Sequence, residues 1–222
     1  MKLYIGLFTL LLFAATPPAV AQSAEERAEA AIQELKEGTL LVRLPSRQRK
    51  MDAMEQVLNG YAPDDKRRAR MERLLQETQE EAATFNRNMM TAFRDSFDFA
   101  KVRFFYDYNT PEVKAGETAG LLLNEDLEAD PSITLPDQPA YILGFGQTNK
   151  DYSDGLEAMF IMSGDFERMG PPFPYYQRLN DFAAFMGSIF PAPNQEMRDA
   201  LRVVGKLDQK LDKFYERVEE RE

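Results

Sequence analysis

Apolar side chains recur along much of this chain at intervals of three and four residues, the spacing of one face of an α-helix. The longest run covers residues 64–97, a second covers residues 196–221, and a narrower stripe covers residues 23–37. These runs predict two long amphipathic helices and a shorter helix that docks through one stripe. In the longest run the heptad positions are Met71, Leu75, Thr78, Ala82, Phe85, Met89 and Ala92. Two interpretations of this seam stay open, packing within the chain and a coiled-coil arm that meets a partner.

Start and stop signals mark the ends of the shorter helices. Ser23 stands three residues before Glu26, which is a capping box, and Gly38 supplies a stop. A further helix over residues 47–58 follows Pro45-Ser46, and an apolar helix over residues 181–190 ends at a proline.

Runs rich in β-branched and aromatic residues predict strands at 39–44, 102–108, 141–146 and 157–162, with weaker signals at 121–123 and 133–135. The first connection holds two helices, which is long enough for parallel pairing, whereas the short later connections favour antiparallel pairing. We therefore predict an α/β fold, with α+β as the alternative. It has a mixed β-sheet of about five strands with long amphipathic helices packed on it, and helical N- and C-terminal extensions.

The N-terminal residues 1–21 have the pattern of an export signal. Lys2 precedes an apolar run that is too short to span a bilayer, and Ala19-Val20-Ala21 is a small-x-small cleavage pattern. We expect an exported protein, periplasmic or secreted, without a membrane span after cleavage. The predicted segments are a signal peptide (1–21), an N-terminal surface helix (22–38), an α/β domain (39–195) and a C-terminal amphipathic helix packed on that domain (196–222).

The composition removes several kinds of chemistry. The chain contains no histidine and no cysteine, which excludes Ser-His-Asp triads, thiolate nucleophiles and His- or Cys-ligated metals. Its net charge of −10 gives no electrostatic reason to bind nucleic acid. The order of elements resembles that of thioredoxin-like proteins in outline only, and without a Cys-x-x-Cys pair that resemblance implies no activity.

Carboxylates are the abundant groups left for chemistry. They gather in two predicted loops, which hold Glu125, Asp126, Glu128 and Asp130, and Asp151, Asp154 and Glu157. A pair of carboxylates across a sugar site would serve a glycan hydrolase, and the same oxygens would suit a cation. We predict no catalytic residue and no metal ligand from them, and keep both alternatives.

Two further motifs concern small ligands. Gly144-Phe145-Gly146 follows a strand, as a dinucleotide-binding turn does, but it lacks the third glycine and a following helix, so no cofactor is predicted. The helix that starts at residue 47 carries Arg47, Arg49 and Lys50 near its N-terminus. A bound phosphate or carboxylate there is an alternative to plain solvated cations.

A proline-aromatic segment is the most unusual stretch of the chain. It contains Pro171, Pro172, Phe173, Pro174, Tyr175 and Tyr176. Three prolines stiffen the backbone, so the segment is either a preorganised partner-binding surface or a crossing loop that tucks Phe173 and one tyrosine into the core.

These observations favour an exported, non-enzymatic binding or accessory protein of the bacterial cell envelope. We expect it to act through its helix faces and the proline-aromatic loop, with another envelope protein as partner. The alternatives are a carboxylate-dependent glycan hydrolase and a small-ligand or metal-ion carrier. The sequence leaves the oligomeric state open.

Overall fold

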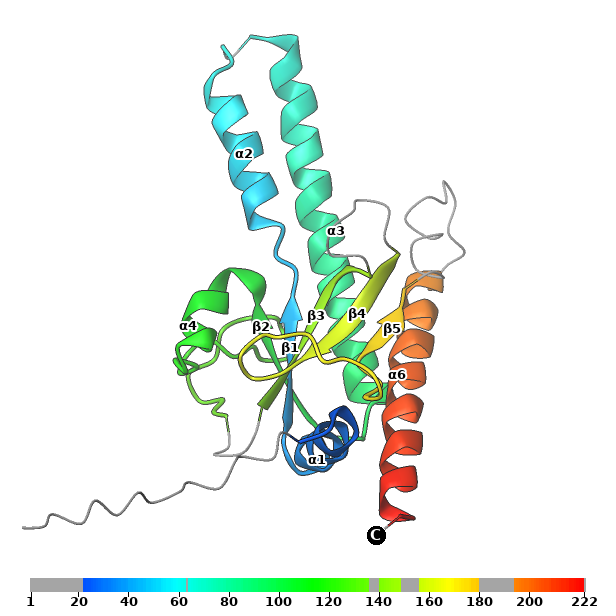
Figure 1. Cartoon of the computed structure of the whole chain (residues 1–222). Coiled ribbons are helices and arrows are strands. Elements are labelled where there is room, and N and C mark those ends of the chain that lie inside the picture. The colour runs from blue at the N-terminus through cyan, green and yellow to red at the C-terminus, as the bar shows by residue number, and fades with distance from the viewer. Residues whose placement is uncertain (1–21, 63, 136–139, 149–155, 180–193, 222) are drawn as a thin grey trace, which may run out of the picture.

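A mixed five-stranded β-sheet lies at the centre of the molecule (Figure 1). The computed structural model describes residues 22–62, 64–135, 140–148, 156–179 and 194–221. The strands are β1 (Thr39–Leu44), β2 (Lys101–Tyr106), β3 (Ala140–Gln147), β4 (Glu157–Met162) and β5 (Tyr176–Arg178), in the order β2-β1-β3-β4-β5. Strand β1 pairs in parallel with β2 and β3, and β4 is antiparallel to β3 and β5. The predicted α/β architecture with a mixed sheet is confirmed.

The described residues form four longer helices, of which α1, α3 and α6 pack on the sheet, together with two short helical turns. Their bounds are α1 (Ala24–Glu37), α2 (Gln48–Asn59), α3 (Lys66–Ser96), a 3₁₀ turn η1 (Asp107–Asn109), α4 (Thr110–Lys114) and α6 (Gln195–Glu219). The capping box of Ser23 and Glu26 forms as predicted at the start of α1, and Gly38 ends that helix. The predicted bounds of the other long helices differ from these by one or two residues, the usual uncertainty at helix ends.

The two faces of the sheet carry separate apolar clusters. Residues Leu40, Val42 and Leu44 of β1 point into the larger core, against α1, α3 and α6. The alternate residue Leu41 belongs to a smaller core on the opposite face, which also contains Phe105, Val113, Leu122, Ile142 and Met162. Burial on both faces explains why β1 is an almost continuous apolar run.

The structure corrects several local predictions. Residues 121–123 and 133–135 belong to none of the described strands and pack on the smaller core, where an isolated bridge pairs Leu123 with Ala129. Strand β2 ends at Tyr106 because η1 and α4 follow at once. The later strands are not all antiparallel, since β3 is parallel to β1. The signal peptide and the helix predicted at 181–190 lie outside the described residues.

Candidate functional site

The α2–α3 hairpin projects outward from the sheet, beyond the carboxyl end of β1 (Figure 1). Between residues 48 and 77, Leu58 is the only buried side chain among those described, whereas the second half of α3 packs into the main core. The long heptad seam therefore has two different environments. The residues of its C-terminal half are part of the main core, and the residues of its N-terminal half pack against α2.

The two helices of the hairpin are held together by a few contacts. The hydroxyl of Thr78 donates to the sulfur of Met54 at 4.0 Å, and the Arg68 guanidinium donates to the Leu58 carbonyl oxygen at 3.3 Å. These contacts fix which turns of α2 and α3 face one another. Val57 lies about one turn after Met54 on α2, and Leu74 lies about one turn before Thr78 on α3. The two residues are therefore at the same level along the hairpin.

Val57 and Leu74 are exposed, at 43% and 38%. Each stands one position before a residue that packs inward, Leu58 on α2 and Leu75 on α3. Successive residues of an α-helix are rotated by about 100°, and α2 and α3 run in opposite directions. The residue before an inward-facing position therefore points to the same side of the hairpin on both helices. Val57 and Leu74 therefore form an exposed apolar pair on one side of the hairpin.

The start of α3 is the most basic part of the hairpin. Lys66–Arg73 contains five cations and one anion, Glu72. Arg67 and Arg68 are paired with Asp65 at 2.7 Å and Glu72 at 2.9 Å. Of these five cations, Lys66, Arg70 and Arg73 are exposed and have no hydrogen-bond or ion-pair partner among the described residues. Arg70 lies four positions before Leu74 and so on the same face of α3, and Arg73 is the residue next to Leu74, about 100° around the helix.

The proline-aromatic segment is anchored in the core through Phe173. This side chain is 2% exposed, and its ring lies edge-on to Phe214 of α6 with ring centroids 6.1 Å apart. Tyr175 and Tyr176 are half-buried, and Tyr176 begins β5. Pro171 and Pro172 remain exposed, so the outward-facing part of the segment is this proline pair.

The carboxylates of the predicted acidic loops do not gather around one cavity. Glu125 and Glu157 line different cavities. Hydrogen bonds explain the shape of the first loop, where Asn124 accepts from the backbone N–H groups of Asp126 and Glu128, each at 3.0 Å. Asp130 accepts from Ser132, which lowers the pKa of Asp130. Asp151 and Asp154 lie outside the described part of the chain.

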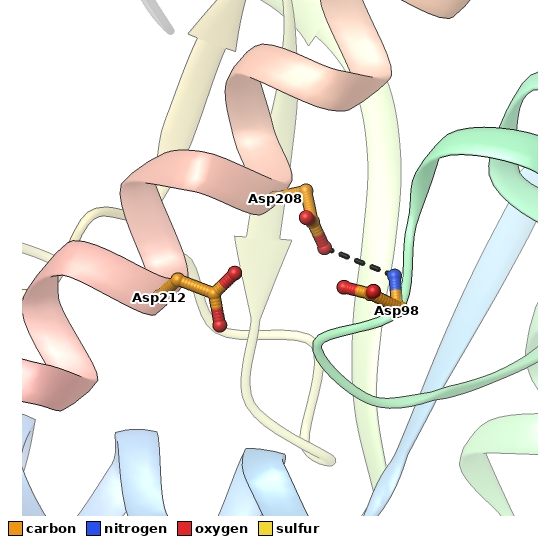
Figure 2. A group of neighbouring side chains, drawn as sticks. All are labelled: Asp98, Asp208 and Asp212. Atoms are coloured by element: carbon orange, nitrogen blue, oxygen red, sulfur yellow. Dashed lines mark hydrogen bonds between the residues drawn. The ribbon is translucent and has the colours of Figure 1, made fainter.

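Three other carboxylates do come together, where α6 meets the connection between α3 and β2 (Figure 2). Oxygens of Asp98, Asp208 and Asp212 all lie within 4.8 Å of one another. Asp208 accepts from the backbone N–H groups of Asp98 at 3.1 Å and Phe99 at 3.0 Å. Asp212 is paired with Lys36 at 3.5 Å. The cluster fastens a backbone turn to α6. This explains why α6 carries a polar residue, Asp208, among its apolar positions.

Asp208 gives a test of this structural role. Burial raises its pKa, and the charges of Asp98 and Asp212 act in the same direction, while the two backbone hydrogen bonds oppose them. A carboxyl with a raised pKa in the folded state contributes stability that is present at low pH and is lost as the pH rises through that pKa. Asp208→Asn keeps an oxygen acceptor and removes the charge, so we expect it to be more stable than the parent at pH 7.

Denaturation by urea at pH 7 and pH 4 measures that difference. The advantage of Asp208→Asn should shrink at the lower pH, because the parent carboxyl then takes up a proton. Asp208→Ala is the matched comparison, since it leaves two N–H groups without their acceptor and should cost about 1–3 kcal/mol. An advantage for Asn that is equal at both pH values would contradict the assignment.

Gly144 and Gly146 lie within strand β3, and β4 follows, so the dinucleotide-binding interpretation is excluded. The structure gives Gly144 a packing reason. A Cβ atom placed there would lie 2.9 Å from Met162 Cε and 3.1 Å from Arg43 Nη2. The absence of a side chain at Gly144 thus leaves room for the guanidinium of Arg43, an arginine in the otherwise apolar strand β1.

A cavity of about 730 Å³ opens at the carboxyl ends of β1 and β2. The cations predicted near the start of α2 all line it, and the structure adds Arg43, which sequence reasoning missed. Ser46 and Asp107 tie the two strand ends together, since Asp107 accepts from the Ser46 backbone N–H at 3.0 Å and from its hydroxyl at 2.5 Å. The signal for Arg43 in the sequence is its charge inside an apolar strand.

Comparisons with known proteins give no relative. No protein-family model, curated protein or solved structure matches the chain. None of the helices in the described ranges is long and apolar enough to cross a membrane.

Proposed function

We propose that this protein is an exported, non-enzymatic binding protein of the bacterial cell envelope and that the α2–α3 hairpin contacts its protein partner. The observation that carries the proposal is the exposed apolar pair. Only four large hydrophobic side chains are exposed among the described residues, and two of them, Val57 and Leu74, lie on one side of this projecting hairpin. An apolar pair held away from the core contributes little to folding, whereas it suits association.

Charge defines the chemistry of the partner. Arg70 and Arg73 lie beside Leu74 of the apolar pair, and Lys66 lies about two turns before it, although the whole chain has a net charge of −10. The complementary surface is an amphipathic helix whose apolar side chains are flanked by carboxylates. The exposed prolines Pro171 and Pro172 are a second candidate contact. Pro171 lines a cavity together with Ala24 and Arg27 at the start of α1, away from the hairpin (Figure 1).

Site-specific photo-crosslinking in the native cell envelope tests the hairpin. A photoreactive amino acid at Leu74 should capture one defined envelope protein, whereas the same amino acid at Gln79 should not. Gln79 is exposed on α3 but lies five residues on, about 140° around the helix. Probes at Pro171 report on the second contact. Equal capture from Leu74 and Gln79 would contradict the proposal, and capture of a second copy of this chain would replace it by self-association.

Binding of the purified partner then tests the charge complementarity. The double variant Arg70→Glu/Arg73→Glu should weaken binding at least tenfold and remove most of its dependence on salt. The matched control is Arg87→Glu, another exposed arginine of α3 farther along the helix. Equal weakening by both variants would show that the start of α3 is not the contact.

Export is tested by the mass of the mature protein. We expect the purified protein to begin at Gln22 and to fractionate with the periplasm or the medium. A chain that retains Met1 would contradict the export prediction and leave the hairpin proposal to its own tests.

A further inference from the structure

We infer that the cavity at the carboxyl ends of β1 and β2 is a binding site for a small organic anion, one with a phosphate or carboxylate group next to a flat ring. This inference is independent of the hairpin's partner. It rests on the place of the cavity in the sheet, on its charge, and on the surroundings of one half-buried arginine, Arg43.

The cavity lies at a switch point of the sheet topology. From β1 the chain crosses to β2 on one side, and it later returns to place β3 on the other side of β1, with all three strands parallel. Connections leave the ends of such strands in opposite directions, which opens a crevice at their carboxyl ends. The connection out of β1 and the one out of β2 form opposite walls of the cavity, and Phe145 of β3 also lines it.

The charge of the cavity is opposite to that of the chain. Four cationic side chains line it, Arg43, Arg47, Arg49 and Lys50, against one carboxylate, Asp107. Asp107 is already engaged by Ser46. Arg47 is paired with Glu81, but Arg49 and Lys50 are exposed and have no ion-pair partner among the described residues. Like charges held this close repel one another, and a bound anion would relieve that repulsion.

Arg43 is the residue that points to a ligand. It is half-buried in a strand, and no hydrogen bond or ion pair joins its guanidinium to any described residue. Burial lowers its pKa and the nearby charge of Asp107 only partly offsets this. A half-buried guanidinium costs free energy unless its five N–H donors find acceptors. None of its nitrogen atoms is among the buried polar atoms without a partner, so water in the cavity reaches the guanidinium. Phosphate and carboxylate groups match its planar fork, so an anion in the cavity would replace that water with charge-assisted acceptors.

The remaining lining favours a ring beside the anionic group. Two aromatic side chains line the cavity, Tyr108, which is 51% exposed, and Phe145, which is half-buried. Flat apolar surface and a few cations together are the usual composition of small-ligand sites, and the volume of about 730 Å³ lies within their range. The site does not depend on the helix N-terminus alone, because Ser46 already accepts from the Gln48 N–H at 3.1 Å.

Calorimetric titration of the mature protein with defined probes tests the inference. Phenyl phosphate and benzoate should bind, inorganic phosphate should bind more weakly than phenyl phosphate, and neutral benzamide should not bind. Arg43→Met should reduce the affinity for phenyl phosphate at least tenfold, while Arg87→Met, on α3 and outside the cavity lining, should leave it unchanged. The two families of probe distinguish a phosphate from a carboxylate ligand.

A second variant tests the inference independently, in case Arg43→Met does not fold. Gly144→Ala keeps every cation but places a methyl group 3.1 Å from the Arg43 guanidinium, so it should displace that group and weaken binding several-fold. Circular dichroism and thermal unfolding show whether both variants are folded. The inference is overturned if no anionic probe binds at millimolar concentration and low salt, or if folded Arg43→Met and Gly144→Ala bind like the parent.

Discussion

Replacing Phe93 by alanine is expected to lower the free energy of unfolding by about 3–5 kcal/mol. Phe93 is fully buried on α3, and its ring centroid lies 5.5 Å from that of Phe97 and 6.2 Å from that of Phe104 on β2. Truncation would remove these ring contacts and leave a cavity between α3 and the sheet. Urea denaturation followed by circular dichroism measures the change.

Leu74→Ala on the same helix is the matched control for Phe93→Ala. Leu74 is 38% exposed at the hairpin, so its truncation should change the free energy of unfolding by less than about 1 kcal/mol. If the two variants lose equal stability, the hairpin end of α3 belongs to the core, and the proposed contact surface fails with it. A large loss at Phe93 alone supports the division of the helix into a buried half and a projecting half.

The periodicity of α3 predicted the helix but not this division. Heptad spacing continues unchanged from Met71 to Ala92, because it records only that one face is apolar. What covers that face is a matter of tertiary structure. Towards its C-terminus the face meets the sheet and α6, and towards its N-terminus it meets α2, a helix of only 12 residues. Both halves of the seam therefore pack within the chain, against α2 or against the main core, and a coiled-coil contact with a partner stays a prediction.

Local signals predicted α1 and the ends of β1 well, because a capping box and a doubly buried strand depend on nearby residues. Short strands and helices were harder to predict from the sequence. Strand β5 has three residues and exists only because β4 offers it an edge. Helix α4 has only five residues, and the proline in its first turn is a start signal that the sequence analysis did not use.

The residues of the candidate anion site could also be predicted only in part from the sequence. Arg47, Arg49 and Lys50 were visible beside a helix start, but their sequence neighbours could not reveal the cavity. Arg43 lies in β1 and Asp107 follows the end of β2, two helices later in the chain, and the parallel pairing of β1 with β2 brings them together. Asp208 is similar, because its partners Asp98 and Phe99 lie more than 100 residues away in sequence.

Placing a carboxylate at Ile32 is expected to unfold the protein. Ile32 is completely buried in the main core, and the other inward residues of α1 are buried with it, namely Ala28, Ala31 and Leu35. An aspartate there has no cationic partner in the apolar stripe, so it must be buried unpaired or take up a proton, and either costs more than about 4 kcal/mol. A stability of 5–15 kcal/mol is typical for a domain, so a loss of this size removes most of it.

Ala30→Asp is the control, because Ala30 is exposed on the same helix and the substitution adds the same charge. It should change the free energy of unfolding by about 0.5 kcal/mol or less. Soluble expression, circular dichroism and urea denaturation of the two variants measure the difference. A folded and stable Ile32→Asp variant would mean that α1 can leave the sheet without loss. A large loss of stability in Ile32→Asp alone would show that this N-terminal helix is part of the folded core, as its place in the same apolar cluster as Leu40, Val42 and Leu44 of β1 indicates.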